Sequence, residues 1–435
     1  MPAFYSNLLI INMLLLISLV QLSLAYEAEL LHKFTWLNFT FETKDEYNQY
    51  FKNKHYEDCT LAGIKMNSKG EIFVSVPRWK SNVPATLNKI VKKYGNTLLQ
   101  PFPSWNQNKI GDIDALQSVL GFEIDKDDNV WVLDQGKVDN QAAVNGTMKL
   151  VKYNSSGNQE LKIELDKVAC PVTSFLNDLV IDTEKEFVYI SDSGNPLNTS
   201  QPLSAWNPAV IVVDVKNKAT RRVLQQHHST NPDPGVWVVI NGERVGSASP
   251  IEAGIDGIAL SCDGSYFYYT PLTSRTLYAI ETSYLRDFNS SNLEKHVIEM
   301  GFKSSTSDGL AMTAKNNLCM TATEKDGIYM HSDIKPDPEK FFYQDFELIA
   351  NNSTSMIWPD TIGFDNTGKK LLFVSNKLNE FYYGKMDFSK GQENFHIWSV
   401  DIDDRSYIYG CDESNDDSSG SLLANIQVVV SLLIS

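Results

Sequence analysis

The chain has 435 residues, of which 42% are hydrophobic and 11% aromatic, so it can bury a large core. It carries 54 acidic and 38 basic side chains, for a formal net charge of -16. Binding to a nucleic-acid backbone needs Lys and Arg gathered on one face, and the chain has no such cluster, which argues against nucleic acid as a partner. An acidic protein favours amines, metal ions or basic partners, although its charge also serves solubility.

The N-terminus predicts a secretory signal peptide over residues 1–25. An apolar run, LLIINMLLLISLVQLSLA, ends in small residues at Ser23 and Ala25, a pattern that is cleaved, here before Tyr26. The run is also just long enough for an uncleaved anchor, and cleavage is the favoured interpretation. The mature protein is therefore expected to be extracellular.

Glycosylation motifs agree with secretion. Asn-x-Ser/Thr acceptors begin at Asn38, Asn145, Asn154, Asn198, Asn289, Asn351 and Asn352. Several stand beside turn residues, where a glycan could project. The five cysteines are Cys59, Cys170, Cys262, Cys319 and Cys411. They lack the CxxC spacing of a zinc site, and an oxidising compartment allows at most two disulfides, whose pairing the sequence leaves open.

Six copies of one pattern follow along the chain. Each consists of an apolar strand, a polar turn and a second apolar or aromatic strand. The copies are GIKMNSKGEIFVSVP from Gly63, GFEIDKDDNVWVLDQ from Gly121, DLVIDTEKEFVYISD from Asp178, GIALSCDGSYFYYTP from Gly257, GLAMTAKNNLCMTAT from Gly309 and TIGFDNTGKKLLFVSN from Thr361. Their starts lie 52 to 79 residues apart, a spacing typical of a repeat fold built from β units.

The repeats predict an all-β fold, a six-bladed β-propeller with four-stranded blades around a central channel, over residues 26–411. Helical patterns are scarce, and the best candidates are TLNKIVKKYG (86–95) and SYLRDF (283–288). A closed ring removes open sheet edges. We therefore expect HKFTWLNFTF (32–41) and FHIWSVDI (395–402) to meet in one shared blade.

Residues 412–435 form an acidic, Ser-rich linker followed by the apolar tail LLANIQVVVSLLIS. A soluble protein has no reason to expose such a tail. Ser418, Ser419 and Gly420 resemble a GPI-attachment site, which makes the tail a GPI-anchor candidate; the alternative is a terminal strand or an unstructured tail. A C-terminal lipid anchor is the only membrane association expected.

The channel mouth is the predicted site. The residue before an inner strand of a propeller blade lies near this mouth, and four such positions hold Asp178, Asp256, Asp308 and Asp360. The second strands return to the same face and end at Arg78, Trp79, Asp134, Gln135, Ser191, Asp192, Thr323, Glu324 and Asn376. The predicted ligand-binding residues are Asp360, Thr361, Asn376, Trp358, Asp308, Asp256, Asp178 and Trp79.

Two kinds of ligand suit such a mouth. Converging carboxylates can hold Ca²⁺ or another divalent cation through their oxygens. They can equally bind an organic ammonium, with aromatic faces adding cation–π attraction. A structural role is the alternative, because Asp before Gly forms turns and caps backbone N–H groups. The sequence has no G-x-S-x-G, HExxH, P-loop or GxGxxG motif.

Long stretches resemble the major royal jelly protein/Yellow family. They are residues 104–137, 256–285, 307–329, 358–378 and 395–402. The VWVLDQG and YFYYTPLTSRTLY runs are the most specific to that family. The resemblance implies a secreted six-bladed propeller, in agreement with the repeat count. It also implies diverse activities, namely dopachrome conversion, binding of biogenic amines in the channel, or storage, so the fold does not settle the function.

Three functions follow as hypotheses. The first is a protein that binds a small cationic or aromatic ligand at the channel mouth, such as a biogenic amine, without a cofactor. Its expected contacts are Asp360, Thr361, Asn376 and Trp358. The second is a dopachrome-type tautomerase or isomerase, which needs a general base. No His falls in the predicted mouth, so a carboxylate would have to be that base.

The third hypothesis is a divalent-metal-dependent, lactonase-like hydrolase. DGIALSCDGSYFYYT is similar to the gluconolactonase/regucalcin propellers, in which a channel cation polarises the ester carbonyl. Asp256, Asp308 and Asp360 would then be the metal ligands. The longer resemblance to the Yellow family ranks this hypothesis last.

Overall fold

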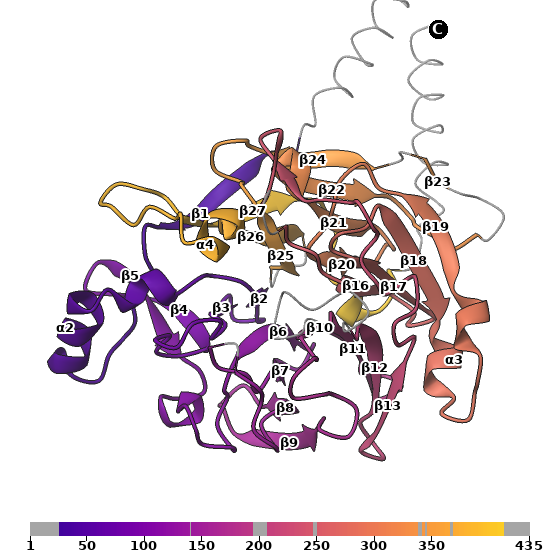
Figure 1. Cartoon of the computed structure of the whole chain (residues 1–435), viewed down its shortest axis with the longest axis horizontal. Helices are drawn as coiled ribbons and strands as arrows, with labels where there is room; N and C mark the ends of the chain where they lie inside the picture. Colours follow the sequence, from indigo (N-terminus) through magenta and orange to yellow (C-terminus); the bar gives the residue numbers. More distant parts are fainter. Residues whose placement is uncertain are drawn as a thin grey trace, which may run out of the picture.

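The computed structural model describes residues 26–139, 141–194, 207–246, 250–337, 342–343, 346–365 and 369–412. Six sheets stand around one axis, and the helices α2 (Lys44–Lys52) and α3 (Thr282–Arg286) lie at the periphery (Figure 1). The predicted six-bladed propeller is confirmed. The predicted signal peptide and almost all of the predicted tail lie outside the described residues. Within those ranges, no helix is long and apolar enough to cross a membrane.

Each of the first three blades runs in chain order from the channel outward. The first blade contains β2 (Ile64–Met66), β3 (Ile72–Ser75), β4 (Leu87–Lys93) and β5 (Asn96–Pro101). The second contains β6 (Val119–Ile124), β7 (Val130–Asp134), β8 (Lys149–Tyr153) and β9 (Gln159–Glu164). The third contains β10 (Leu176–Asp182), β11 (Phe187–Asp192), β12 (Ala209–Asp214) and β13 (Ala219–Val223).

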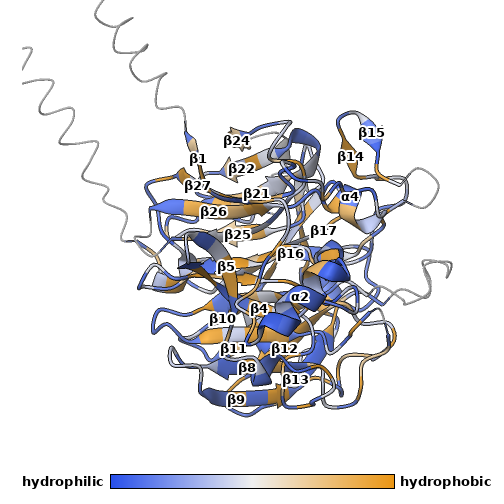
Figure 2. Ribbon diagram, turned by 90° about the vertical axis from the view of Figure 1, so that its left-hand side faces the viewer, coloured by the Kyte–Doolittle hydropathy of each residue, from blue (hydrophilic) through white to orange (hydrophobic). Residues whose placement is uncertain are grey.

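The other three blades carry the irregularities of the ring. The fourth contains β16 (Ile255–Leu260), β17 (Tyr266–Pro271), β18 (Thr276–Glu281), β19 (Ile298–Phe302) and the added β23 (Phe342–Tyr343). The fifth contains β20 (Leu310–Met312), β21 (Leu318–Ala322), β22 (Gly327–His331) and β24 (Glu347–Asn351). The sixth contains β25 (Pro359–Phe364), β26 (Lys370–Ser375), β27 (Phe395–Asp401) and β1 (Ala28–Phe34). A separate hairpin, β14 (Val239–Ile240) with β15 (Glu243–Arg244), stands on the same face as α4 (Leu378–Tyr382) (Figure 2).

The ring closes in the sixth blade. The N-terminal strand β1 pairs antiparallel with β27, so that Phe34 lies opposite Phe395. The predicted shared blade is therefore confirmed, although its N-terminal strand begins before residues 32–41 and overlaps them only up to Phe34. Phe39, within that range, instead forms a parallel bridge to Leu99 of β5. Pairing of β1 with β27 joins the two ends of the chain in one blade, in which β1 is the outer edge strand.

One helix prediction is confirmed and the other is wrong. The segment 283–288 contains α3 (Thr282–Arg286), as expected. Residues 86–95 instead form β4 and the turn to β5, where Tyr94 and Gly95 have positive φ angles of 53° and 77°. Two successive residues in this conformation make the tight turn of a β-hairpin. Pairing with β3 and β5 therefore overrides the weak helical pattern of this lysine-rich segment.

A helix that the sequence analysis missed, α2 (Lys44–Lys52), begins with a capping box. The Thr43 hydroxyl accepts from the Glu46 amide, and the Glu46 carboxylate accepts from the Thr43 amide at 2.9 Å. This reciprocal pair satisfies two amide groups that a helix start leaves open. The Thr43-Glu46 spacing was therefore a usable signal.

The glycine of the repeat allows neighbouring inner strands to approach. A Cβ at Gly257 would lie 2.3 Å from the carbonyl oxygen of Asp308, and one at Gly309 would lie 2.6 Å from that of Asp360. Only glycine leaves room for such a backbone approach. The spacing that makes the repeat visible in the sequence therefore also brings successive aspartates together around the channel.

Adjacent blades pack through apolar clusters. Phe73, Phe122 and Tyr153 belong to the cluster between the first and second blades, and Phe73 meets Phe102 edge to face at 5.1 Å. Outer strands such as β9 are more hydrophilic (Figure 2). Burial of aromatic rings between blades gives the ring its rigidity.

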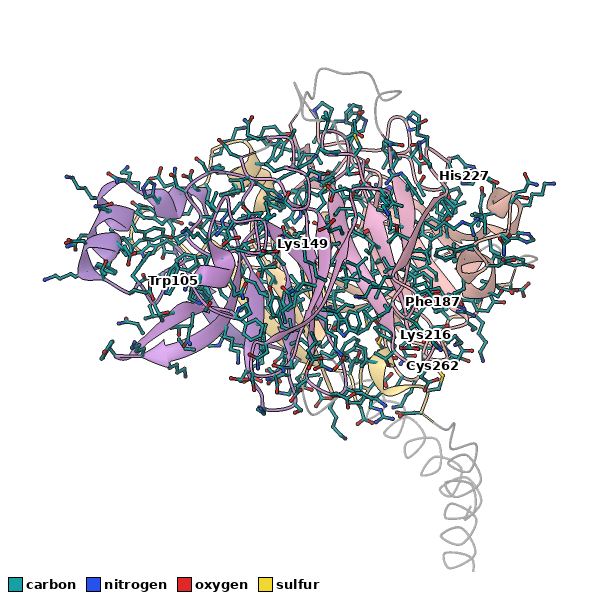
Figure 3. The ribbon with its side chains drawn as sticks, turned by 90° about the horizontal axis from the view of Figure 1, so that it is seen from below. Trp105, Lys149, Phe187, Lys216, His227 and Cys262 are labelled. Carbon is teal, nitrogen blue, oxygen red and sulfur yellow. A yellow bond between two sulfur atoms is a disulfide. The ribbon has the colours of Figure 1, made fainter. Side chains whose placement is uncertain are left out.

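The far end of the channel is covered by the C-terminal segment. Its short 3-10 helix, Tyr407–Tyr409, buries Tyr407, whose hydroxyl accepts a hydrogen bond from the Ile181 amide of β10 at 3.0 Å. The disulfide Cys262–Cys411 ties this segment to the turn after β16. Figure 3 shows Cys262 on the opposite side of the propeller from His227. The remaining cysteines of the chain, Cys59, Cys170 and Cys319, are free thiols.

Candidate functional site

A cavity of about 510 Å³ lies at the channel mouth. All four predicted aspartates line it, together with Trp79, Trp358 and Thr361. Asn376 lies behind this lining and is fully buried. The eight predicted ligand-binding residues therefore come together at one place. Sequence reasoning missed other lining residues, among them Asn177, Phe175 and Phe381.

The four aspartates form what we call the acidic floor, which consists of Asp178, Asp256, Asp308 and Asp360. Asp256, Asp308 and Asp360 are only 5%, 8% and 4% exposed, and Asp178 is partly exposed. Within the described part of the chain, none of the four carboxylates forms an ion pair. The floor therefore concentrates negative charge that these residues leave uncompensated.

Polar neighbours orient the floor. The Trp358 indole N–H donates to Asp308 Oδ2 at 2.6 Å, and Asn376 Nδ2 donates to Asp360 Oδ2 at 2.6 Å. The Thr361 hydroxyl donates to the other oxygen of Asp360 at 2.8 Å. Trp358 holds this position with a φ of 54°, an uncommon conformation for a bulky residue. Such local strain clusters at functional sites.

The pKa values of the floor carboxyls are all raised. Burial, opposed by nearby Lys65, raises the pKa of Asp178 to about 6. Burial likewise raises the pKa of Asp360 to about 6. Asp256 and Asp308 are hydrogen-bonded to each other, and burial, with repulsion from Asp360, raises both pKa values well above the ordinary range. The floor carboxyls therefore keep their protons to a higher pH than an exposed aspartate does.

Beneath the floor lies a compensated ion pair. Lys65 Nζ lies 3.4 Å from the Glu123 carboxylate, and the same ammonium donates to the Ile362 carbonyl at 2.9 Å. The two side chains are 12% and 10% exposed. Lys65 is already paired with Glu123. One lysine cannot also balance the four carboxyl groups of the acidic floor, so the floor has an excess of carboxyl groups.

The cationic groups around the mouth are held by backbone carbonyls. The Arg78 guanidinium donates to five carbonyl groups, from Val83 to Gln117. Lys137 Nζ donates to the Val172 carbonyl at 3.0 Å, and burial lowers its pKa to about 8. Lys80 Nζ donates to a carbonyl and lies 4.2 Å from the centre of the Phe381 ring. These cations therefore stabilise the rim and do not pair with the floor.

The wall of the cavity is aromatic and apolar. Trp79 stacks on Phe175 with ring centres 6.4 Å apart, and Leu272 and Phe381 also line the space. The Trp79 indole N–H is buried and has no hydrogen-bond partner among the described residues. Buried N–H groups without a partner are rare in proteins.

Two other carboxylates expected near the mouth are structural. Asp134 and Asp192 are fully buried. Asp134 accepts three backbone N–H groups and the Lys149 ammonium at 3.0 Å, and Lys149 is labelled in Figure 3. Asp192 accepts the Phe175 and Gly194 amides and the Arg222 guanidinium. They end the second strands of their blades, and their contacts fix the loops.

Among the described residues, no group of three or more His, Cys, Asp or Glu is arranged to hold a metal ion.

The glycosylation acceptors Asn145, Asn289, Asn351 and Asn352 are exposed. Asn38 and Asn154 are partly exposed, and Asn198 lies outside the described residues. Glycan attachment stays a prediction.

Fold and site together define a closed six-bladed propeller with an acidic-floored cavity at one end of its channel. Residues 117–411 match the major royal jelly protein family, and the chain belongs to that family. It is 26% identical over 269 residues to major royal jelly protein 5 of Apis mellifera, covering 60% of this chain and 42% of that protein. It is 23% identical over 418 residues to protein yellow of Drosophila subobscura, covering 89% and 68%.

A solved structure also aligns with much of the chain. A gluconolactonase from Xanthomonas campestris matches with a TM-score of 0.45 and 12% identity, over 79% of this chain and 86% of that one. This likeness is too distant to bear on function.

Proposed function

We propose that this protein is a secreted or cell-surface Yellow-like propeller that binds a small organic cation with an aromatic body at the channel mouth. The observation that carries the proposal is the acidic floor, whose carboxyl groups have no cationic partner among the described residues. A buried carboxylate without a counter-charge is costly, and a ligand ammonium would supply that charge.

The wall of the cavity suits the remainder of such a ligand. The Trp79 and Phe175 rings offer flat faces for an aromatic group. Attraction of a cation to a tryptophan face adds about 1 kcal/mol, and more when both groups are desolvated. The cavity volume of about 510 Å³ is in the range of small-molecule sites. A biogenic amine combines the two required parts.

The hydrogen-bonded Asp256 and Asp308 favour one alternative, the dopachrome-type tautomerase. A carboxyl whose pKa is raised by burial can serve as general acid, and its ionised partner as general base. Turnover of a dopachrome-type substrate, lost on substitution of either aspartate, would establish this activity in place of simple binding.

The decisive experiment is isothermal titration of the purified, metal-stripped protein with serotonin, dopamine and Ca²⁺. We expect amine binding that weakens about ten- to a hundredfold in Asp360→Asn, because a hydrogen bond to a charged group contributes about 1.5–3 kcal/mol. Asn376→Ala, which removes the partner of Asp360, should weaken binding in the same direction. The matched control is Asp127→Asn, an exposed turn residue distant from the cavity, which should bind like the parent.

Each outcome decides between the hypotheses. Binding of Ca²⁺ alone, lost in Asp360→Asn, would favour the metal-dependent hydrolase. If neither of the amines nor Ca²⁺ gives any heat of binding, the proposed ligand class is contradicted.

A further inference from the structure

Asp256 and Asp308, which we call the carboxyl pair, are neighbouring buried residues whose side chains line the cavity. They stand before Gly257 and Gly309 on adjacent blades, where the close approach of the inner strands brings them together. Their side chains are hydrogen-bonded to each other. Two ionised carboxylates repel each other and offer only acceptors, so the pair favours the state in which one of them keeps its proton. The ligand-free pair therefore holds one proton and one negative charge.

The surroundings of the pair prepare it for full ionisation. The Trp358 indole N–H donates to Asp308, and the nearby Asn177 side chain lowers the pKa of Asp256, against the larger rise from burial. Both groups remain available when the proton leaves. Full ionisation of the pair also needs a positive charge near the two carboxylates. Without such a charge, two like charges in a buried site repel each other too strongly for both to persist. The pair lines the cavity, so a ligand cation can reach it.

We propose that ligand capture at this site is an exchange, in which the entering organic cation displaces the proton held between Asp256 and Asp308. The carboxyl O–H bond breaks, the proton passes to solvent buffer, and the ammonium takes its place beside two carboxylates. The net charge of the site is unchanged. This inference rests on the proposed function and adds how pH regulates ligand binding. The protein binds its ligand at neutral pH and releases it on acidification.

Other charged and titratable groups face the pair from every side. They are Lys65 of β2, Glu123 of β6, Asp178 of β10, Asp360 of β25, Lys303 after β19, Arg78, Lys80, Lys137 and Glu252 at the rim, and Tyr407 below. Lys303 is a second candidate source of a released proton, because burial lowers its pKa to about 7 and it interacts with Asp256. Its contribution therefore has to be tested separately. Its ammonium donates to the Thr270 hydroxyl at 2.6 Å, within the fourth blade.

The test is titration of the full protein with serotonin from pH 5 to pH 8, in buffers of different ionisation enthalpy. The serotonin ammonium stays protonated throughout, since the pKa of an alkyl ammonium is about 10. We expect release of about one proton per ligand, and affinity that rises about tenfold per pH unit, at every pH below the raised pKa of the pair, because one proton competes with one cation. Above that pKa both effects should vanish.

Two variants assign the proton. Lys303→Met removes the neighbouring titratable group and should leave the release below pH 6 intact. Asp308→Asn removes one member of the pair and should abolish most of the release and flatten the pH dependence. Release that disappears in Lys303→Met, or persists in Asp308→Asn, overturns the assignment. If Asp308→Asn does not fold, the buffer series on the parent protein and on Lys303→Met still decides.

The exchange and the proposed function fail in different ways. Serotonin binding without proton release, and with equal affinity at pH 5 and pH 7, overturns the exchange and leaves the binding function standing. The absence of binding at every pH overturns both.

Discussion

Asp178→Asn should stabilise the ligand-free protein at neutral pH. Asp178 lines the cavity, and its carboxylate accepts a hydrogen bond from the Leu179 amide at 2.8 Å, a bond that the oxygen of Asn can keep. The substitution therefore removes a charge and leaves the shape almost unchanged. Burial raises the pKa of Asp178 to about 6, so the folded state holds this charge at a disadvantage.

The size of the effect follows from the pKa difference. An aspartate in an unfolded chain has a pKa of about 3.9, and one pKa unit corresponds to about 1.4 kcal/mol. The folded protein binds the proton more tightly, so stability falls as the pH rises from about 4 to about 6, and the whole loss is present at pH 7. Two units give about 3 kcal/mol; because Asp178 is partly exposed to water in the cavity, we expect about 2–3 kcal/mol.

Urea unfolding followed by tryptophan fluorescence at pH 4, 5, 6 and 7 measures this difference. The gain in Asp178→Asn should be near zero at pH 4 and reach its full value at pH 7. Asp127→Asn, in an exposed turn, should change stability by less than about 0.5 kcal/mol at every pH. A gain that is equal at pH 4 and pH 7, or a loss at pH 7, would refute the claim that Asp178 carries a raised pKa.

Three more substitutions test the packing around the site. Lys149→Met leaves the buried Asp134 carboxylate without its cation and should cost about 3–5 kcal/mol in urea unfolding at pH 7; a loss below about 1 kcal/mol would mean that backbone N–H groups carry the charge alone. Cys262→Ser opens a disulfide that spans 149 residues and should cost up to about 5 kcal/mol by the chain-entropy relation, with an unchanged thermal midpoint contradicting its structural role. Trp358→Phe removes the donor to Asp308 and should weaken serotonin binding about tenfold by titration calorimetry, while equal affinity would show that this bond does not support the ligand site.

The floor could be predicted from the sequence because the repeat fixes a position in the ring. The glycines after Asp256 and Asp308 are required where inner strands approach, so the preceding residues fall at equivalent places around the channel. Position in a symmetrical fold is thus readable from spacing alone. The hydrogen bond between the two carboxyls is not readable in this way, because it depends on side-chain rotamers.

Long-range partners escaped the sequence analysis. Lys65 and Glu123 lie on the inner strands of different blades, and nothing in their local sequence indicates that they meet at 3.4 Å. The Cys262–Cys411 bridge is a similar case, since pairing depends on where the C-terminal segment crosses the ring. Local patterns determine strands and turns, whereas contacts across the channel depend on the assembled ring.

Two buried aspartates with a structural role can be compared directly with the aspartates of the floor. Asp134 and Asp192 are fully buried, yet each has a cation and backbone N–H donors directed at its oxygens. Asp256 and Asp308 are also buried, but among the described residues they have no cation and instead bond to each other. A fold that can surround two carboxylates with compensating charge has left two others at a cavity without it. Burial of this kind lowers stability, and natural proteins retain such groups where binding or catalysis requires them. The difference between the two kinds of aspartate therefore points to a ligand as the missing partner of the acidic floor.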